Sequence, residues 1–235
     1  MSTLLVRSVN LSTQTANAWK DTGSQFARRG RTTAEIMALP FNNIVNLGKS
    51  SFQPVTADYP DTMVWNHGED IRPLLWPGAA AELLDGLMPP RPLTYPADVW
   101  IKAPGAQGRG KYKKAIDYPL VLPKEWDWQG HVEGQEWRLI TVGHKVVQDL
   151  KRHGSNEDRT YEWVPMKDTP SELKELAREA ARRVPGNNVI AWDLIQTHDG
   201  LTWLFEGNTC PGISESTGNR ILKEMERQYA ERHNN

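Results

Sequence analysis

The stretch from 188 to 208, NVIAWDLIQTHDGLTWLFEGN, has the pattern of a β-hairpin. Two apolar runs flank Asp199-Gly200, a dipeptide typical of two-residue hairpin turns. This turn places Asp193 directly opposite Glu206 on the neighbouring strand. Asn208 points to the same face, because side chains alternate along a strand. The hairpin therefore gathers three polar side chains on one face.

Two carboxylates in directly opposed positions have Cβ atoms about 4.5–5.5 Å apart, where like charges repel. The pair costs stability unless a cation lies between the carboxylates or one of them is protonated. Two carboxylates and an amide oxygen are hard ligands that suit Mg2+. We therefore expect a metal site at Asp193, Glu206 and Asn208. The alternatives are solvated carboxylates on an exposed face, or a slipped register.

A glycine-rich basic loop follows a strand expected at Val99–Lys102. Glycines let backbone N–H groups approach phosphate oxygens, and neighbouring basic side chains supply positive charge. The loop matches neither the pattern GxxxxGK[ST] nor a GxGxxG that opens a helix. A plain flexible connection between strands is the alternative. Its characteristic residues are Gly105, Gly108, Arg109 and Gly110.

A second hairpin is expected from Glu136 to Arg152. Gly143-His144 suits its turn, because glycine at the first central position favours type II′. That turn gives the register two opposite-charge cross-strand pairs. The predicted pairs are Glu136 with Lys151 and Arg138 with Asp149.

The remaining segments alternate between strand and helix patterns. A capping box with proline predicts a helix that starts at Thr169–Glu172 and ends near Pro185-Gly186. Leucines and alanines after Pro77-Gly78 predict a helix that ends at Pro89-Pro90. The other expected elements are strands at 4–9, 43–46 and 63–65, a helix within 16–29, and a final helix carrying Ile221, Met225 and Tyr229 at helical spacing.

The composition is that of an ordinary globular chain. The 235 residues include 28 Lys and Arg against 29 Asp and Glu, a formal net charge of −1. This balance disfavours nucleic-acid binding by the whole protein. No apolar run approaches the roughly 18 residues that cross a bilayer, so we expect no membrane partner and a cytoplasmic location. The single cysteine, Cys210, excludes an intramolecular disulfide and a multi-cysteine metal site.

Residues 97–220 resemble the ATP-grasp ligases through a series of segments in this order: Lys102, GAQGRG, EWR, VGHKVVQDLKR, AWDLI and FEGNTCPG. FEGNTCPG is similar to the family signature E-x-N-x-x-P-G. Short phage-type members and ligases that extend peptide ends are the nearest in pattern. The earlier stretch NIVNLGKSS resembles the N-x-G-x-S segment of the phage-type members. A phage-encoded chain would act in the cytoplasm of its host.

The resemblance implies an α+β ATP-grasp fold with three parts: an N-terminal βαβ-like region (1–75), a central subdomain with the glycine lid (76–123) and a C-terminal subdomain with the metal site (124–235). It implies ATP and Mg2+ as cofactors. The reaction would join a small-molecule or peptide carboxylate to an amine acceptor through an acyl phosphate, releasing ADP and phosphate. A homodimer is the commonest assembly for an enzyme of this size.

The resemblance also implies roles for individual residues. Asp193, Glu206 and Asn208 would hold magnesium, and Lys102 would contact the α- and β-phosphates. The loop from Gly105 to Gly110 would close over the triphosphate. Arg138 and Arg152 would face the γ-phosphate and the substrate carboxylate. The hinge for adenine would be Val121–Trp126, including Lys124, Glu125 and Trp126. The family's second nucleotide lysine has no counterpart at Leu75–Pro77.

Two other readings stay open. Ten tryptophans and short basic stretches are compatible with a nucleic-acid-binding or nucleic-acid-modifying protein, whose binding would weaken steeply with salt. The absent second lysine is compatible with an ATP-grasp protein that binds nucleotide without ligating.

Overall fold

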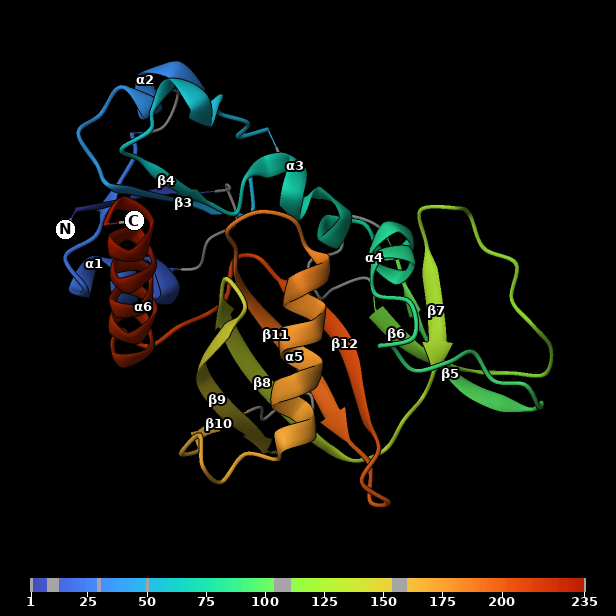
Figure 1. The fold of residues 1–235 in the computed structure, drawn as a ribbon. Coiled ribbons are helices and arrows are strands. Elements are labelled where there is room, and N and C mark those ends of the chain that lie inside the picture. Colours follow the sequence, from blue (N-terminus) through green and yellow to red (C-terminus); the bar gives the residue numbers. More distant parts are fainter. Residues whose placement is uncertain are drawn as a thin grey trace.

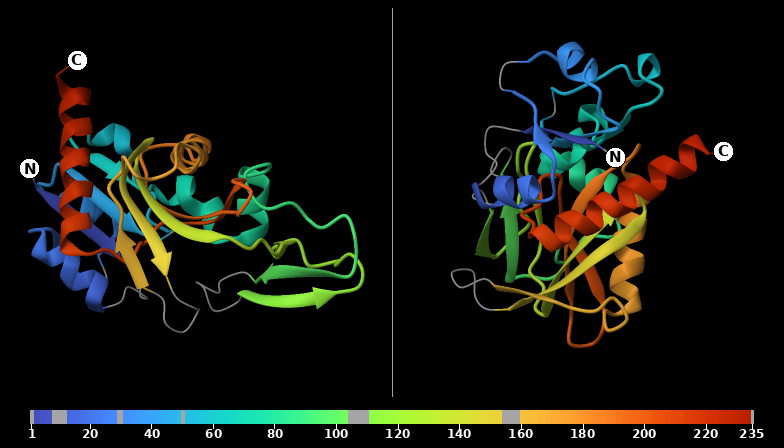
Figure 2. Two further views of the ribbon diagram at one scale, coloured as in Figure 1. Left: turned by 90° about the horizontal axis from the view of Figure 1, so that it is seen from below. Right: turned by 90° about the vertical axis from the view of Figure 1, so that its left-hand side faces the viewer.

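The computed structural model describes residues 2–7, 13–28, 31–49, 51–103, 111–153 and 160–234. Three sheets lie one after another along the molecule (Figures 1 and 2). The N-terminal sheet and both termini lie at one end, and the C-terminal sheet lies in the middle. The sheet built by the central part of the chain, called the central sheet below, lies at the other end. This mixed architecture is the expected α+β class.

The N-terminal sheet is parallel, with strand order β2-β1-β3-β4. Its apolar strands are buried on both faces, as parallel strands usually are. The region comprises β1 (Thr3–Arg7), α1 (Thr13–Asp21), β2 (Gln25–Phe26), α2 (Thr33–Met37), β3 (Asn43–Leu47), the 3-10 turn η1 (Thr56–Asp58) and β4 (Met63–Trp65). The expected βαβ arrangement is confirmed by the pairing of β1 with β3. The first helix is shorter and earlier than the predicted 16–29, and β2 and α2 were not predicted.

The central sheet is antiparallel, with order β6-β5-β7. Short helices connect it to the N-terminal sheet. These elements are α3 (Gly68–Ile71), the 3-10 turn η2 (Arg72–Leu75), α4 (Pro77–Leu83), β5 (Ala97–Lys102), β6 (Lys111–Ile116) and β7 (Asp127–Gly130). One face packs a small cluster around Val99 and Ile101. Lys102 therefore points to the opposite face.

The C-terminal sheet is antiparallel, with order β10-β9-β8-β11-β12. Helix α5 packs on one face, and α6 packs beside α1 towards the N-terminal sheet (Figure 1). The elements are β8 (Gln135–Val142), β9 (Lys145–His153), β10 (Thr160–Trp163), α5 (Ser171–Arg183), β11 (Val189–Gln196), β12 (Thr202–Asn208) and α6 (Glu215–His233).

The β11–β12 hairpin confirms the pairing of Asp193 with Glu206 but not the predicted turn. Thr197 donates its N–H to the Leu201 carbonyl at 2.8 Å, and Gly200 has φ 88°, so three residues form the loop. That loop displaces the register by one residue. A β-bulge at Phe205 then restores it before Glu206.

The β8–β9 hairpin has the predicted Gly143-His144 turn, and Gly143 has φ 55°. A bulge between Ile140 and Thr141 shifts the register beyond it. The predicted cross-strand pairs of Glu136 and Arg138 are therefore wrong. The observed partners are Trp137 with Lys151, Arg138 with Leu150 and Leu139 with Asp149.

The predicted capping box of α5 is also wrong. The N-cap residue is Pro170, which has no side-chain hydrogen bond to offer, and Ser171 Oγ bonds Glu172 at 3.2 Å. The apolar face of the helix still packs as its spacing predicts, through Leu173, Ala177 and Ala180.

Candidate active site

The three predicted metal ligands lie together on one face of the β11–β12 hairpin. The Asn208 amide Nδ2 donates to Asp193 Oδ2 at 3.1 Å and to Glu206 Oε1 at 3.5 Å. The amide therefore bridges the two carboxylates. All three side chains are partly exposed, so solvent and ligands can reach them.

Arg138 supplies the cation that the carboxylate pair requires. It lies opposite Asp193 on β8, and its guanidinium bonds both carboxylate oxygens: Nε to Oδ1 at 2.6 Å and Nη2 to Oδ2 at 2.8 Å. Two parallel charge-assisted bonds are the strong geometry for this pair. The Arg138 guanidinium therefore offsets part of the repulsion expected between Asp193 and Glu206.

Lys102 reaches this site from the central sheet. Its ammonium donates to the Phe205 carbonyl at 2.6 Å and to Gln129 Oε1 at 2.8 Å. Phe205 is the extra residue of the bulge, so the bulge aims a carbonyl at the lysine. Burial lowers the pKa of Lys102 to about 8, although the negative charges of Asp127 and Asp193 act to raise it.

Asp127 and Gln129 on β7 were missed by the sequence analysis. Burial raises the pKa of the Asp127 carboxyl, while Lys102 pulls it downward. Arg91 lies 3.5 Å from the same carboxylate. The alternation of Asp127 and Gln129 with Trp126 and Trp128 was the available signal for a strand with one polar face.

Arg152 lies on β9, on the same face as Arg138. Its guanidinium pairs with Glu136, and the side chain is mostly buried. The predicted site residues that the structure brings into direct contact are Arg138, Asp193, Glu206 and Asn208. Gly105, Gly108, Arg109 and Gly110 lie outside the described residues.

The segment 121–126, predicted as the adenine hinge, packs on the other face of the central sheet from Lys102. Trp126 packs with Leu120 and Leu122 on the Val99 face of the central sheet, opposite to the face of Lys102. Lys124 and Glu125 are exposed, and the Glu125 carbonyl accepts the N–H of Gly78 at 3.4 Å. The structure does not bring this segment to Lys102.

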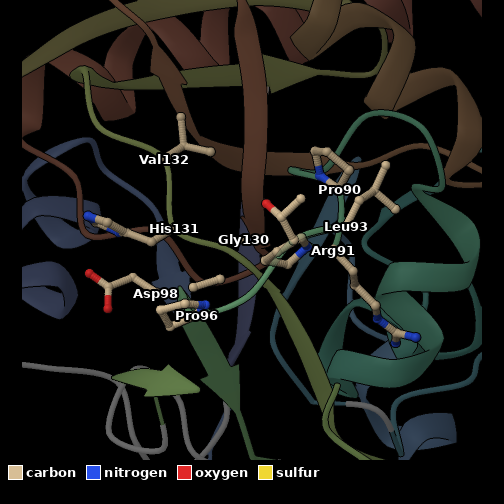
Figure 3. Close-up of a pocket in the computed structure, with 11 residues that line it drawn as sticks. Pro90, Arg91, Leu93, Pro96, Asp98, Gly130, His131 and Val132 are labelled. Atoms are coloured by element: carbon tan, nitrogen blue, oxygen red, sulfur yellow. The ribbon is translucent and has the colours of Figure 1, made fainter. Parts of the chain in front are cut away.

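A cavity of about 590 Å³ lies at the outer end of the central sheet (Figure 3). His131 and Asp98 line one side, and Pro90, Arg91 and Leu93 line the other. The Trp100 indole donates to His131 Nδ1 at 2.9 Å, which leaves the ring proton on Nε2. Asp98 and Lys102 share one face of β5 with Trp100, so the cavity continues the face on which Lys102 lies.

The donor set of the hairpin fits a hard divalent cation. The set consists of two carboxylates and the Asn208 amide, and within the described residues no group of three His, Cys, Asp or Glu side chains could hold a metal. A turn of the Asn208 amide exchanges Nδ2 for Oδ1 towards the two carboxylates, which gives three oxygen ligands. Separately, no helix in the part of the chain that the structure describes is long and apolar enough to span a membrane.

Comparisons with known proteins bear on the fold. No model of a protein family matches the sequence, and no curated protein matches it significantly. The structure is similar to D-alanine–D-alanine ligase from Bacillus anthracis, with a TM-score of 0.65, 10% identity, and coverage of 98% of this chain and 99% of that chain.

Two further solved structures are similar to this chain. The ATP-grasp ligase PsnB complexed with minimal precursor gives a TM-score of 0.65 at 14% identity, covering 95% of this chain and 99% of that one. A RimK domain ATP-grasp protein from Sphaerobacter thermophilus gives 0.57 at 15% identity, covering 94% and 98%. Because these similarities extend over nearly the whole of each chain, the protein has the ATP-grasp fold.

Proposed function

We propose that the protein is an ATP-dependent ligase that joins a carboxylate to an amine. The observation that carries the proposal is the meeting of Lys102 with the Asp193–Glu206–Asn208 face, through the Phe205 carbonyl. A cationic group from one sheet and an acidic, oxygen-rich group from another are what a nucleoside triphosphate with Mg2+ requires.

Lys102 would bind the α- and β-phosphates. Its buried ammonium already donates to two neutral oxygens, and phosphate oxygens are stronger acceptors that would hold it in the charged form. Asp193, Glu206 and Asn208 would hold Mg2+, which when bound neutralises phosphate charge. Solved complexes of similar proteins contain ATP, or Mg and ADP.

Arg138 would change partner during the reaction. In the described structure it holds both oxygens of Asp193. If Asp193 binds the metal, the planar guanidinium would exchange the Asp193 oxygens for oxygens of the γ-phosphate, with the same two-point geometry. Arg152, on the same face, would orient the substrate carboxylate.

The chemistry follows from these charges. A substrate carboxylate oxygen attacks the γ-phosphorus, the bond to the β–γ bridging oxygen breaks, and ADP leaves. The resulting acyl phosphate is attacked by an amine, which loses a proton as phosphate leaves and an amide forms. Arg138, Arg152 and Lys102 lower the barrier by neutralising two anions that must approach each other.

The cavity at the outer end of β5 and β7 is the better candidate for the base end of the nucleotide than the segment 121–126. Its residues Asp98 and His131 continue the face of Lys102, whereas 121–126 packs on the other face. The backbone from Gly130 to Val132 would supply the contacts that the sequence analysis assigned to Lys124, Glu125 and Trp126.

The proposed substrates are an amino acid or peptide carboxylate and an amine acceptor. The similar structures include a D-alanine–D-alanine ligase and PsnB complexed with a precursor peptide. We also propose a homodimer as the assembly, on the frequency of dimers alone.

A phosphate-release screen tests the function. Mg-ATP is combined with amino acids and peptides, with and without amine acceptors, and the products are identified by mass. Phosphate release that requires both a carboxylate and an amine supports the ligase. Arg138→Leu should abolish it, while Arg182→Leu, which removes an exposed helix ion pair, should not. Nucleotide binding without turnover over the whole panel would favour the non-ligating ATP-grasp protein, and salt-sensitive nucleic-acid binding would favour the nucleic-acid-binding protein.

A further inference from the structure

Two fully buried asparagines join the ends of β3 and β4. The side chain of Asn46 donates to the Asn66 carbonyl at 2.8 Å, and the side chain of Asn66 donates to the Asn46 carbonyl at 3.0 Å. Asn46 also accepts the N–H of Lys49 at 2.9 Å, which closes the turn after β3. We call this reciprocal pair the asparagine clamp.

The clamp extends beyond the N-terminal sheet to the candidate metal hairpin. The Asn66 amide Nδ2 donates to the Val189 carbonyl at 3.0 Å and to the Thr209 carbonyl at 3.1 Å. Its Oδ1 accepts the N–H of Val189 at 2.7 Å. Val189 begins β11, and Thr209 directly follows Asn208, so one side chain holds the start of one strand and the exit of the other.

Asn66 adopts an unusual backbone conformation to make these contacts. Its φ is 57°, in the left-handed region that residues other than glycine rarely occupy. Asparagine tolerates this region better than most residues, but it still costs free energy. Among the described residues no other non-glycine has a positive φ. Surrounding contacts must therefore hold the residue in place.

Thr209 is the first residue after the paired part of β12, so its contact with Asn66 lies directly beside Asn208. Strand pairing in β12 ends at Asn208, which lies opposite Ala191. Beyond this point the ladder no longer fixes the backbone, and the hydrogen bond from Asn66 fixes the direction in which the chain leaves the strand. The side chain of Asn208 must turn between two carboxylates, so its backbone needs support on both sides.

We propose that Asn66 is a positioning residue for metal binding, which sets the orientation of Asn208 by anchoring Thr209 and Val189 to the N-terminal sheet. The proposal rests on the proposed function for the identity of the metal site. It adds that the N-terminal region, which supplies none of the ligands, controls the affinity of that site.

The test replaces Asn66 with glycine, which accepts the same φ without strain and removes every side-chain contact. The Mg2+ concentration that gives half of the ATP-dependent rise in Tm is measured for parent and variant. Asn66→Gly should raise it about tenfold or more, as loss of supporting contacts around a metal site does. Asn188→Ala is the matched control, because the hydrogen bonds that this buried amide makes within the described residues go to the local carbonyls of Val184, Pro185 and Gly186. It should lower Tm without changing the Mg2+ requirement.

Hydrogen exchange separates failure of this inference from failure of the proposed function. In metal-free protein, Asn66→Gly should speed exchange at the amide of Val189. In Asn188→Ala, the difference in the exchange rate of this amide between metal-bound and metal-free protein should be the same as in the parent. In the parent, Mg-ATP should slow exchange at Val189, because coupling is reciprocal. An unchanged Mg2+ requirement in Asn66→Gly, or no effect of Mg-ATP on Val189, overturns the positioning role. Absence of any ATP-dependent rise in Tm in the parent overturns the proposed function instead. If Asn66→Gly does not fold, the measurement on the parent decides.

Discussion

Lys102 has a buried ammonium whose pKa lies near 8 instead of the usual 10.5, because burial disfavours the charge. The folded protein therefore binds fewer protons than the unfolded chain between these values. Stability gains from this group as pH rises from about 8 towards 10.5. The difference in unfolding free energy between parent and Lys102→Met should show this slope, measured by urea melts across the range.

The same lysine should matter for nucleotide affinity. Lys102→Met should weaken ATP binding about ten- to a hundredfold, equivalent to the roughly 1.5–3 kcal/mol of a hydrogen bond to a charged group. Titration calorimetry at pH 7 measures it. Parent affinity should also fall as pH rises above 8. Equal affinity in the variant would remove Lys102 from the phosphate site.

Repulsion between Asp193 and Glu206 alone would make removal of one charge stabilising, but the bond of Asp193 to Arg138 reverses this expectation. The bidentate bond to Arg138 means that Asp193→Asn weakens two charge-assisted hydrogen bonds to a mostly buried guanidinium. The metal-free variant should lose about 1.5–3 kcal/mol of stability and all Mg-ATP-dependent stabilisation. Asp199→Asn, in the exposed hairpin loop, is the control and should change neither. Thermal melts with and without Mg-ATP measure both effects, and a variant that still responds to Mg-ATP contradicts the metal site.

At the scale of elements, β12 packs closely against β11 on the face opposite to Glu206 and Asn208. A Cβ at Gly207 would lie 2.6 Å from Cζ3 of the fully buried Trp192, whose indole also bonds Thr141. Gly207→Ala should therefore cost about 1–3 kcal/mol. Gly212→Ala meets only Thr15 Oγ1 at 3.7 Å and should be tolerated. Urea denaturation of the two variants compares them, and equal stability would show that Trp192 moves freely.

Helix α6 is fastened to the β8–β9 hairpin through Glu224. Burial opposes ionisation of this carboxyl, but hydrogen bonds from Arg227, Lys145 and Gln228 outweigh it and lower the pKa to about 2. A depressed pKa contributes stability that is fully present above the usual pKa of 4.5 and is lost as pH falls towards 2. Glu224→Gln should flatten the acid limb of the stability profile in that window. An unchanged acid limb, measured by thermal melts at stepped pH, would show that Glu224 does not anchor the helix.

At the scale of the whole molecule, one core joins the N-terminal and C-terminal sheets. Leu5, Val45 and Trp65 pack in the same cluster as Val189 and Ile221. The central sheet has a separate small cluster. The N-terminal and C-terminal sheets should therefore unfold together, and the central sheet of β5, β6 and β7 should open more independently.

Ile221→Ala tests this cooperativity. It should cost about 2–5 kcal/mol and should speed hydrogen exchange equally in β1, β3, β8 and β11. Ile116→Ala, in the central cluster, should speed exchange mainly in β5, β6 and β7. Loss of protection confined to the C-terminal sheet in Ile221→Ala would contradict the shared core.

Local patterns were sufficient for most elements. Strands and helices follow from apolar periodicity, and turns such as Gly143-His144 follow from residues that accept positive φ. The two β-bulges were not predictable, because the spacing of apolar and polar residues does not indicate where a strand contains an extra, unpaired residue. The pairing of Asp193 with Glu206 was reached only because the longer loop and the bulge at Phe205 displace the register in opposite directions.

The sequence by itself determined which side chains share a face of the β11–β12 hairpin and which loop carries glycines and basic residues, since alternation and turn preference act between neighbours. Only the tertiary structure decided which groups from distant segments meet them. Arg138 reaches Asp193 through pairing of β8 with β11, Lys102 reaches the Phe205 carbonyl across 103 positions, and Asn66 reaches Thr209 across 143. Such contacts depend on how complete sheets pack against each other, and that packing minimises the free energy of the whole chain instead of following local spacing.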